Sequence, residues 1–115
     1  MVDLETAKKA GVMELAALAR LVKIAKSDTG QSRRVADFLL AWWNAGSCGG
    51  FDLTNLWAVD GAIAEDMALV VRLIGRVHSY PDALGYGADF AEIVEQWRPE
   101  LIEAPTAGKN TIGSP

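Results

Sequence analysis

Cys48 carries the most reactive side chain in this sequence, and it lies in the glycine-rich stretch WWNAGSCGGFDL at residues 42–53. A cysteine becomes a nucleophile when a histidine, a cation or a helix N-terminus lowers its pKa. The only histidine, His78, lies far along the chain, at the expected end of a helix. Because no activating partner is near in the sequence, we expect Cys48 to be a small residue in a connection and the protein to be non-enzymatic.

Other patterns that support chemistry are incomplete. The glycines around Cys48 lack the lysine of a P-loop and the spacing of a dinucleotide fingerprint, and they are typical of a helix end followed by a tight turn. One cysteine and one histidine are too few for a zinc site. The carboxylate pairs Glu65–Asp66 and Glu92–Glu95 are typical of solvent-facing helix surfaces. We therefore expect no catalytic residue, no metal and no cofactor.

The composition is that of one globular domain. The chain has 115 residues, of which 50% are hydrophobic and 23% are charged, which suffices for one core and not for two domains. A single cysteine cannot form an internal disulfide and is typical of a reducing compartment. The N-terminal residues contain no apolar signal core, and no stretch is long and apolar enough to span a bilayer. We expect a soluble, cytoplasmic protein with no membrane partner.

Hydrophobic periodicity predicts an all-α fold, a single compact bundle of four helices with a short fifth helix as an addition. No run of alternating β-branched residues and no hairpin signal is present. The expected helices cover residues 11–26, 29–45, 59–78 and 88–97, with the short helix at residues 53–57. We expect residues 1–103 to form the helical domain. The proline- and glycine-rich residues 104–115 are expected to form a flexible tail.

Capping patterns predict where these helices begin and end. Asp28 and Gln31 have the spacing of a capping box at the start of the second helix. Gly46 suits the left-handed position that ends this helix, because glycine lacks a Cβ. Asp52 is expected to cap the short helical turn at residues 53–57.

The third helix is expected to be the central one. Its buried seam alternates steps of four and three residues, and further apolar residues extend beyond that seam. The seam comprises Ile63, Met67, Val70, Ile74 and Val77. Leu69 and Leu73 lie beyond it, so this helix presents more apolar surface than one narrow contact uses.

Apolar residues that the helix seams do not use predict a protein-interaction surface. Neighbouring residues of a helix point about 100° apart, so Trp42 and Trp43 cannot both face one narrow core. Tryptophan is enriched where binding energy concentrates. The expected contact residues are Trp43, Trp57, Leu69 and Leu73. A homodimer that buries them is the simplest form of such an interaction.

Basic residues gather in the first third of the chain, where residues 1–34 carry a net charge of +3 against −7 for residues 35–115. The stretch LVKIAKSDTGQSRRVADFLLAW, residues 21–42, resembles a helix-turn-helix motif, whose second helix enters the major groove of DNA. The turn is one residue longer than usual, and the second helix continues as a long apolar one. The resemblance implies that bases are read by Gln31, Ser32, Arg33 and Arg34, with Lys23 and Lys26 near phosphates. A nucleic-acid-binding regulator using residues 20–34 is therefore the alternative function.

A second resemblance covers more of the chain. The stretches QSRRVADFLLAWWNAGSCGGFDLTNLWAVD and YPDALGYGADF, between residue 31 and about residue 99, are similar to a small uncharacterised all-α bacterial domain family. That family occurs in accessory regions such as plasmids and integrative elements. The resemblance implies a small helical accessory protein and supplies no activity. We therefore expect a non-enzymatic protein-interaction module of a bacterium or mobile genetic element, with a modulator or inhibitor of another protein as a natural extension.

Overall fold

The computed structural model describes residues 10–102, and its regular elements are helical. The α-helices are α2 (Val12–Ala25), α3 (Gly30–Cys48), α4 (Gly61–Val77) and α5 (Gly87–Trp97). Three short 3-10 helices accompany them: η1 (Leu53–Ala58), η2 (Pro81–Ala83) and η3 (Pro99–Leu101). No β-strand occurs within residues 10–102, and the all-α prediction is confirmed. The domain boundary expected at residue 103 and the tail expected at residues 104–115 lie outside the described residues.

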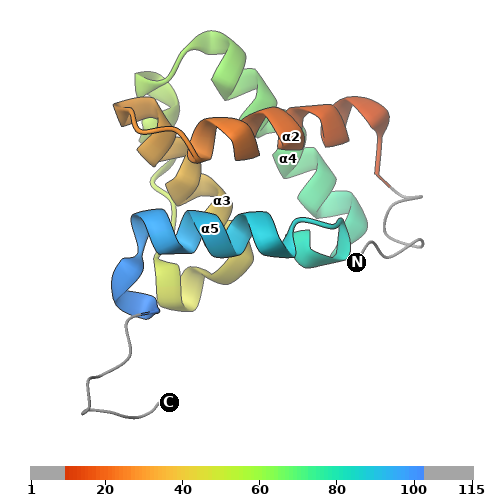
Figure 1. The fold of residues 1–115 in the computed structure, drawn as a ribbon. Coiled ribbons are helices and arrows are strands. Elements are labelled where there is room, and N and C mark those ends of the chain that lie inside the picture. The colour runs from red at the N-terminus through yellow and green to blue at the C-terminus, as the bar shows by residue number, and fades with distance from the viewer. Residues whose placement is uncertain (1–9, 103–115) are drawn as a thin grey trace.

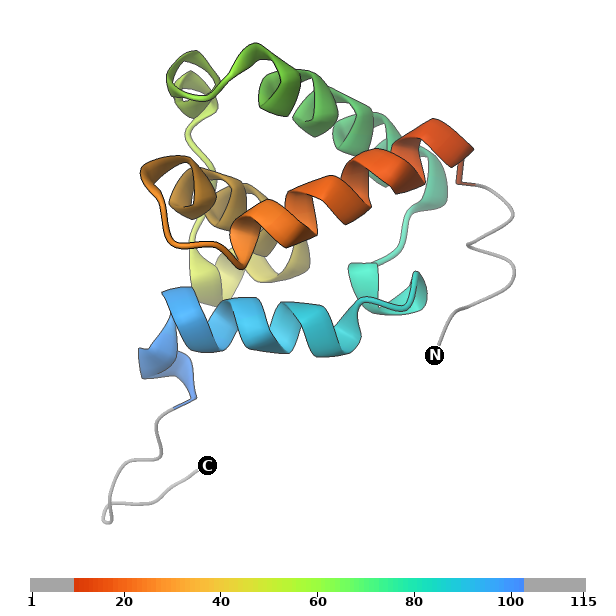
Figure 2. The same ribbon diagram turned by 45° about the horizontal axis from the view of Figure 1, so that its top comes forward.

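The central helix is α2, which packs against α3, α4 and α5 (Figure 1). Figure 2 shows α2 running between α4 on one side and α5 on the other. The expectation that residues 59–78 form the central helix is wrong, because α4 packs mainly against α2 and leaves its other faces to solvent. The long apolar stripe of α4 was misleading, since α2 is rich in alanine and small residues allow several helices to approach it closely.

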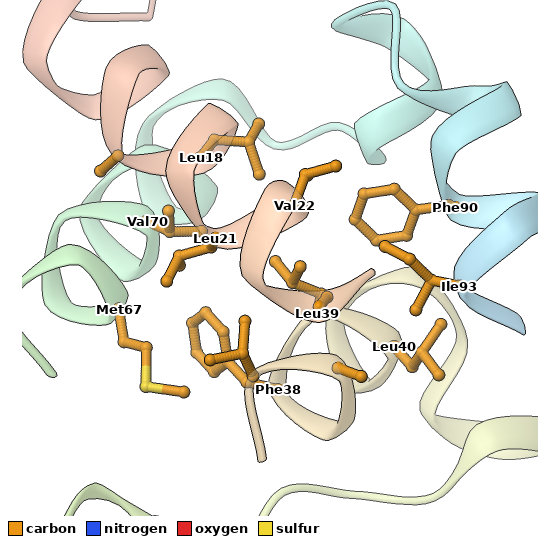
Figure 3. Close-up of a cluster of buried hydrophobic side chains, with 14 of the residues drawn as sticks. Leu18, Leu21, Val22, Phe38, Leu39, Leu40, Met67, Val70, Phe90 and Ile93 are labelled. Atoms are coloured by element: carbon orange, nitrogen blue, oxygen red, sulfur yellow. The ribbon is translucent and has the colours of Figure 1, made fainter. Parts of the chain in front are cut away.

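One hydrophobic core joins all four α-helices (Figure 3). Burial of each large apolar side chain stabilises the fold by roughly 1.5–3 kcal/mol. The labelled core residues in Figure 3 are Leu18, Leu21, Val22, Phe38, Leu39, Leu40, Met67, Val70, Phe90 and Ile93. The expected seam of α4 is largely confirmed, with Ile63, Met67, Val70 and Val77 buried. Ile74 is only half-buried, however, and the adjacent Leu73 is fully buried in its place.

Two basic residues of the first third of the chain, Arg20 and Lys26, form ion pairs within the fold. The guanidinium of Arg20 donates two hydrogen bonds of 2.9 Å to the carboxylate of Asp66, which fastens α2 to α4. Lys26, at the end of α2, donates to Asp89 and lies 3.4 Å from Glu92, which fastens α2 to α5. Basic residues from the first third of the chain therefore form ion pairs with acidic residues from the rest of the chain, across neighbouring helices.

The observed N-caps contradict one capping prediction and confirm another. Thr29 is the N-cap of α3, because its side chain accepts a 3.0 Å hydrogen bond from the N–H of Ser32, while Asp28 is exposed in the preceding turn. The capping box predicted for Asp28 is therefore wrong by one residue. Asp52 does cap η1, since its carboxylate accepts a 2.9 Å hydrogen bond from the N–H of Thr54.

Candidate protein-interaction site

The stretch WWNAGSCGG contains a break in α3. Asn44 has φ −164° and ψ 79°, outside the helical region, and its side chain accepts a 3.2 Å hydrogen bond from the N–H of Ser47. Asn44 thus ends the regular part of α3 and starts one further helical turn, which runs to Cys48. Gly49, with φ +96°, ends that turn. The left-handed position predicted for Gly46 is therefore occupied by Gly49, because the asparagine restarts the helix for one turn.

Cys48 is buried at the end of this turn, and its backbone carbonyl is hydrogen-bonded to a side chain. The Arg98 guanidinium donates a 3.1 Å hydrogen bond to the Cys48 carbonyl and a 2.7 Å hydrogen bond to Asp37. Burial raises the pKa of the Cys48 thiol. The ring of His78 donates to the Gly75 carbonyl instead, and no hydrogen bond or ion pair among the described residues joins His78 to Cys48. The sulfur therefore has no imidazole partner to activate it.

Two of the half-buried tryptophans have their indole N–H groups bound to backbone carbonyls. The indole of Trp42 donates a 3.1 Å hydrogen bond to the carbonyl of Ser79, just after α4. Its ring packs edge-on against Phe90, with ring centroids 6.2 Å apart. The indole of Trp97 donates a 2.7 Å hydrogen bond to the carbonyl of Ala25, the last residue of α2. Trp43 packs against the core, yet no residue between 10 and 102 accepts a hydrogen bond from its indole N–H. Trp42 and Trp97 are therefore structural residues, whereas Trp43 retains a free donor.

Trp43 forms a wall shared by two adjoining cavities. The first, here called the apolar groove, has a volume of about 380 Å³ and lies between the end of α3 and α5. It is lined by Trp43, Asn44, Ser47, Ala91, Val94 and Ile102 among others. The second, here called the polar cleft, is an open depression of about 960 Å³ between the end of α3 and the connection that follows α4. Its principal side chains are Trp42, Trp43, Asn44, His78, Tyr80 and Asp82.

Trp57 lies elsewhere, on a protrusion formed by η1. Its side chain is 84% exposed and that of Leu53 is 71% exposed, and no residue of η1 is buried. The turn is nevertheless anchored, because Arg34 of α3 donates a hydrogen bond to Asn55. The expected exposure of Trp57 is thus present in the structure, on a rigidly attached element.

The two leucines expected at the contact surface have different surroundings. Leu69 is half-buried beside a shallow hollow that also includes the exposed Val12 and Met13 and the stem of Arg72. Leu73 is fully buried against α2, so its expected place on an exposed surface is wrong. The four expected residues therefore do not form one surface: Trp43, Trp57 and Leu69 lie at three separate places, and Leu73 belongs to the core.

Four of the six residues expected to bind nucleic acid are engaged in contacts inside the fold, including Ser32, which is buried and donates its N–H to the side chain of Thr29. Lys26 is paired with α5, Gln31 is hydrogen-bonded to Asp60, and Arg34 is hydrogen-bonded to Asn55. Lys23 and Arg33 are exposed, and no ion pair among the described residues engages either of them. The tertiary structure thus leaves two of the six residues, the cations Lys23 and Arg33, exposed and without an ion pair among the described residues.

A family model matches residues 15–98, more than half of the chain, with the description of a family of unknown function, DUF7673. The chain belongs to the DUF7673 family. The similarity of residues 31–99 to an uncharacterised domain family is confirmed to this extent. No curated protein and no solved structure matches the chain. Among residues 10–102, no helix has the length and apolar character needed to cross a bilayer.

The candidate surfaces differ in whether their residues lie within the region that matches the DUF7673 family. All residues lining the polar cleft, from Ala41 to Ala83, fall within it, as does Trp43 itself. The hollow beside Leu69 depends on Val12 and Met13, which precede the matched region. The sequence patterns did not indicate Tyr80 or Asp82, because SYPDA is typical of a turn and carries no periodicity that would place it against Trp43.

Proposed function

We propose that this DUF7673 protein is a non-enzymatic protein-interaction module that binds a segment of another protein across Trp43. The observation that carries the proposal is the position of this indole: half-buried, shared by two adjoining cavities, and without an acceptor for its N–H among the described residues. A tryptophan N–H usually finds a hydrogen-bond partner when the ring is buried, as it would be under a bound segment. A bound backbone carbonyl would provide the missing acceptor.

The size and lining of the two cavities support this proposal. Ligand sites are typically concave, about 300–1,000 Å³ in volume, and combine apolar walls with a few polar groups. The apolar groove and the polar cleft each fall in this range, and they share Trp43 and Asn44. The site is also rigidly built, because Asn44 sets the helix break and Trp42 is held by Ser79 and Phe90. Rigid sites lose less conformational entropy when they bind.

Several finer features belong to the same proposal. The resemblance of residues 31–99 supports an origin in a bacterium or mobile genetic element, and the single cysteine supports a cytoplasmic location. A small protein that binds one partner segment is suited to modulate or inhibit that partner. Self-association is proposed through the η1 protrusion, because a symmetric dimer contact can bury both copies of an exposed side chain such as Trp57.

Selection of peptides by the full chain tests the proposal. Random dodecapeptides displayed on phage are selected on the immobilised wild-type protein, and the enriched sequences are synthesised and titrated by fluorescence anisotropy. We expect related peptides to be enriched, and Trp43→Ala to weaken their binding at least tenfold, whereas Trp57→Ala leaves it unchanged. Failure to enrich any related set, or equal binding by Trp43→Ala, contradicts the proposal.

Nucleic-acid binding is the competing proposal, supported by the exposed cations Lys23 and Arg33 at the α2–α3 turn. Binding through phosphate contacts falls steeply with salt, because each contact releases counterions. A gel-shift series over salt concentration with random-sequence duplex DNA separates the two proposals. Binding at low salt that disappears in the Lys23→Ala/Arg33→Ala double variant would favour a nucleic-acid regulator. Absence of binding at low salt removes it.

A further inference from the structure

The geometry points to a partner segment that places a lysine or arginine in the polar cleft and a neighbouring bulky aliphatic side chain in the apolar groove. This inference rests on the proposed function, because it specifies the chemistry of the segment bound across Trp43. The charges that line the two cavities, the helix ends that meet there and the lining of the groove support it.

Asp82 is the carboxylate of the polar cleft, and it has no counterion there. It lines the cleft together with Trp43 and Tyr80, and no hydrogen bond or ion pair among the described residues engages its side chain. No lysine or arginine lines either cavity. His78, the remaining titratable group of positive character, directs its ring N–H to the Gly75 carbonyl. An incoming cation would therefore meet a carboxylate that forms no ion pair among the described residues, and no lysine or arginine.

Two helix C-termini add to this preference for a cation. The regular part of α3 ends at the cleft, where Asn44 leaves the helical conformation, and α4 ends there at His78, whose φ is +51°. The C-terminal end of a helix carries a partial negative charge, which favours a nearby cation. Arg76, in the last turn of α4, is paired with Glu14 on another side of the helix. The ends of α3 and α4 thus add to the negative charge of Asp82, whereas the N-terminus of α5 at Gly87, beside the Asp82 carboxylate, carries a partial positive charge.

Aromatic rings complete the cation site. Trp43 and Tyr80 line the cleft, and the Tyr80 side chain is 64% exposed. A guanidinium or ammonium group over such a ring is attracted by the negative face of the ring. Because Asp82 supplies the charge and the rings supply apolar faces, the cleft suits the long, partly apolar side chain of lysine or arginine better than a small inorganic cation.

The apolar groove accounts for the second side chain. Ala91 and Val94 of α5 line it, together with the partly exposed Leu101 and Ile102. Its small alanine leaves space that a leucine or methionine side chain would fill. Since Trp43 lines both the groove and the cleft, one extended segment that crosses the indole reaches both. A backbone carbonyl of that segment can accept a hydrogen bond from the Trp43 indole N–H.

Charge reversal at Asp82 tests this inference. The same phage library is selected on wild type, on Asp82→Lys and on Asp28→Lys, which makes an identical charge change in the exposed α2–α3 turn away from both cavities. We expect peptides from wild type and from Asp28→Lys to be enriched in lysine and arginine beside an aliphatic residue. Peptides from Asp82→Lys are expected to lose the basic residue and keep the aliphatic one. Binding of a wild-type-selected peptide should weaken about tenfold in Asp82→Lys.

The outcomes separate this inference from the proposed function. If peptides require Trp43 but show no basic preference, or if Asp82→Lys binds them as tightly as Asp28→Lys does, the inference is wrong and the proposed function stands. If no related peptides are enriched at all, both are wrong. Asp82→Asn, which removes the charge without adding one, provides a second variant and should weaken binding by an intermediate factor. Binding by wild type should also weaken as salt is raised, because screening reduces the attraction.

Discussion

The side-chain oxygen of Gln31 accepts a 2.6 Å hydrogen bond from the backbone N–H of Asp60, the residue that precedes α4. The amide of Gln31 also donates to the Asp60 carboxylate at 3.3 Å. A residue at the start of α3 therefore fixes the start of α4, and η1 is held between this contact and the bond from Arg34 to Asn55. Gln31, which a helix-turn-helix would use to read bases, has a structural role in this fold.

Gln31→Ala should therefore destabilise the protein. Both hydrogen bonds to Asp60 are lost, and we expect the free energy of unfolding to fall by about 1 kcal/mol, the usual net contribution of such bonds. Urea denaturation followed by circular dichroism measures the change. Arg33→Ala, at an exposed neighbouring position, is the control and should change stability by less than about 0.5 kcal/mol. Equal effects of the two substitutions would show that the contact to Asp60 is not stabilising.

The indole N–H of Trp97 should matter for stability, and that of Trp43 should not. Trp97→Phe leaves the Ala25 carbonyl without its donor, so a loss of about 1–3 kcal/mol is expected, including the smaller ring volume. Trp43→Phe makes the same change in ring size but breaks no hydrogen bond within residues 10–102. Urea denaturation of both variants measures the difference. A larger loss for Trp43→Phe would contradict the assignment of Trp43 as a free donor.

Cys48 should react slowly with thiol reagents in the folded protein. Burial raises its pKa, so the thiol stays protonated at pH 7 and is shielded from solvent. We expect its reaction with a disulfide reagent such as Ellman's reagent to be at least tenfold slower in native buffer than in concentrated guanidinium. Reaction at equal rates in the two conditions would indicate an accessible, activated sulfur and would reopen the question of thiol chemistry.

The same pKa shift predicts a pH dependence of stability. The folded-state pKa of Cys48 lies above its unfolded value, so its contribution is fully present below the unfolded pKa and is lost as pH rises through the folded one. The free energy of unfolding should therefore decline above about pH 8.5, the unperturbed thiol value. Other groups titrate in this range, and the difference between wild type and Cys48→Ala isolates the thiol. Parallel pH profiles for the two proteins would contradict the shift.

The η1 protrusion should determine the mass of the protein in solution. If a symmetric dimer buries Trp57, sedimentation equilibrium will give twice the 12.3 kDa mass of one chain, and Trp57→Ala will shift it to the mass of a monomer. Because the side chain is almost fully exposed, this substitution should change stability by less than about 0.5 kcal/mol. Asp52 retains the N-cap in both proteins. A wild-type monomer at high protein concentration would exclude self-association through η1.

The sequence patterns predicted the elements of the fold well and their arrangement poorly. Apolar spacing identified all four α-helices to within a few residues and the 3-10 turn at Leu53–Ala58, because each helix must bury one stripe. The same spacing placed α4 at the centre and Leu73 at the surface. An apolar stripe shows only that one face of a helix is apolar. The number of neighbouring helices that cover this face depends on how closely those helices approach.

The candidate site could be predicted only in part, and the reason is the distance between its parts along the chain. Trp43 was identified as a contact residue because two adjacent indoles cannot share one narrow face. Tyr80 and Asp82 come from the connection after α4, and they reach Trp43 because that connection is anchored by the bond from Trp42 to Ser79. No local pattern encodes such a contact.

The sequence by itself determined that this chain is helical, where its helices lie, and that Cys48 lacks a local activating partner, because these properties follow from spacing and residue type. Only the tertiary structure decided that α2 is central and that Arg20, Lys26 and Arg34 are bound by Asp66, Asp89 and Asn55. It also decided that Trp42 and Trp97 donate their indole N–H groups to backbone carbonyls whereas Trp43 does not within residues 10–102. Such outcomes depend on which distant carbonyls and carboxylates come within hydrogen-bonding distance, and that is set by packing of the whole core.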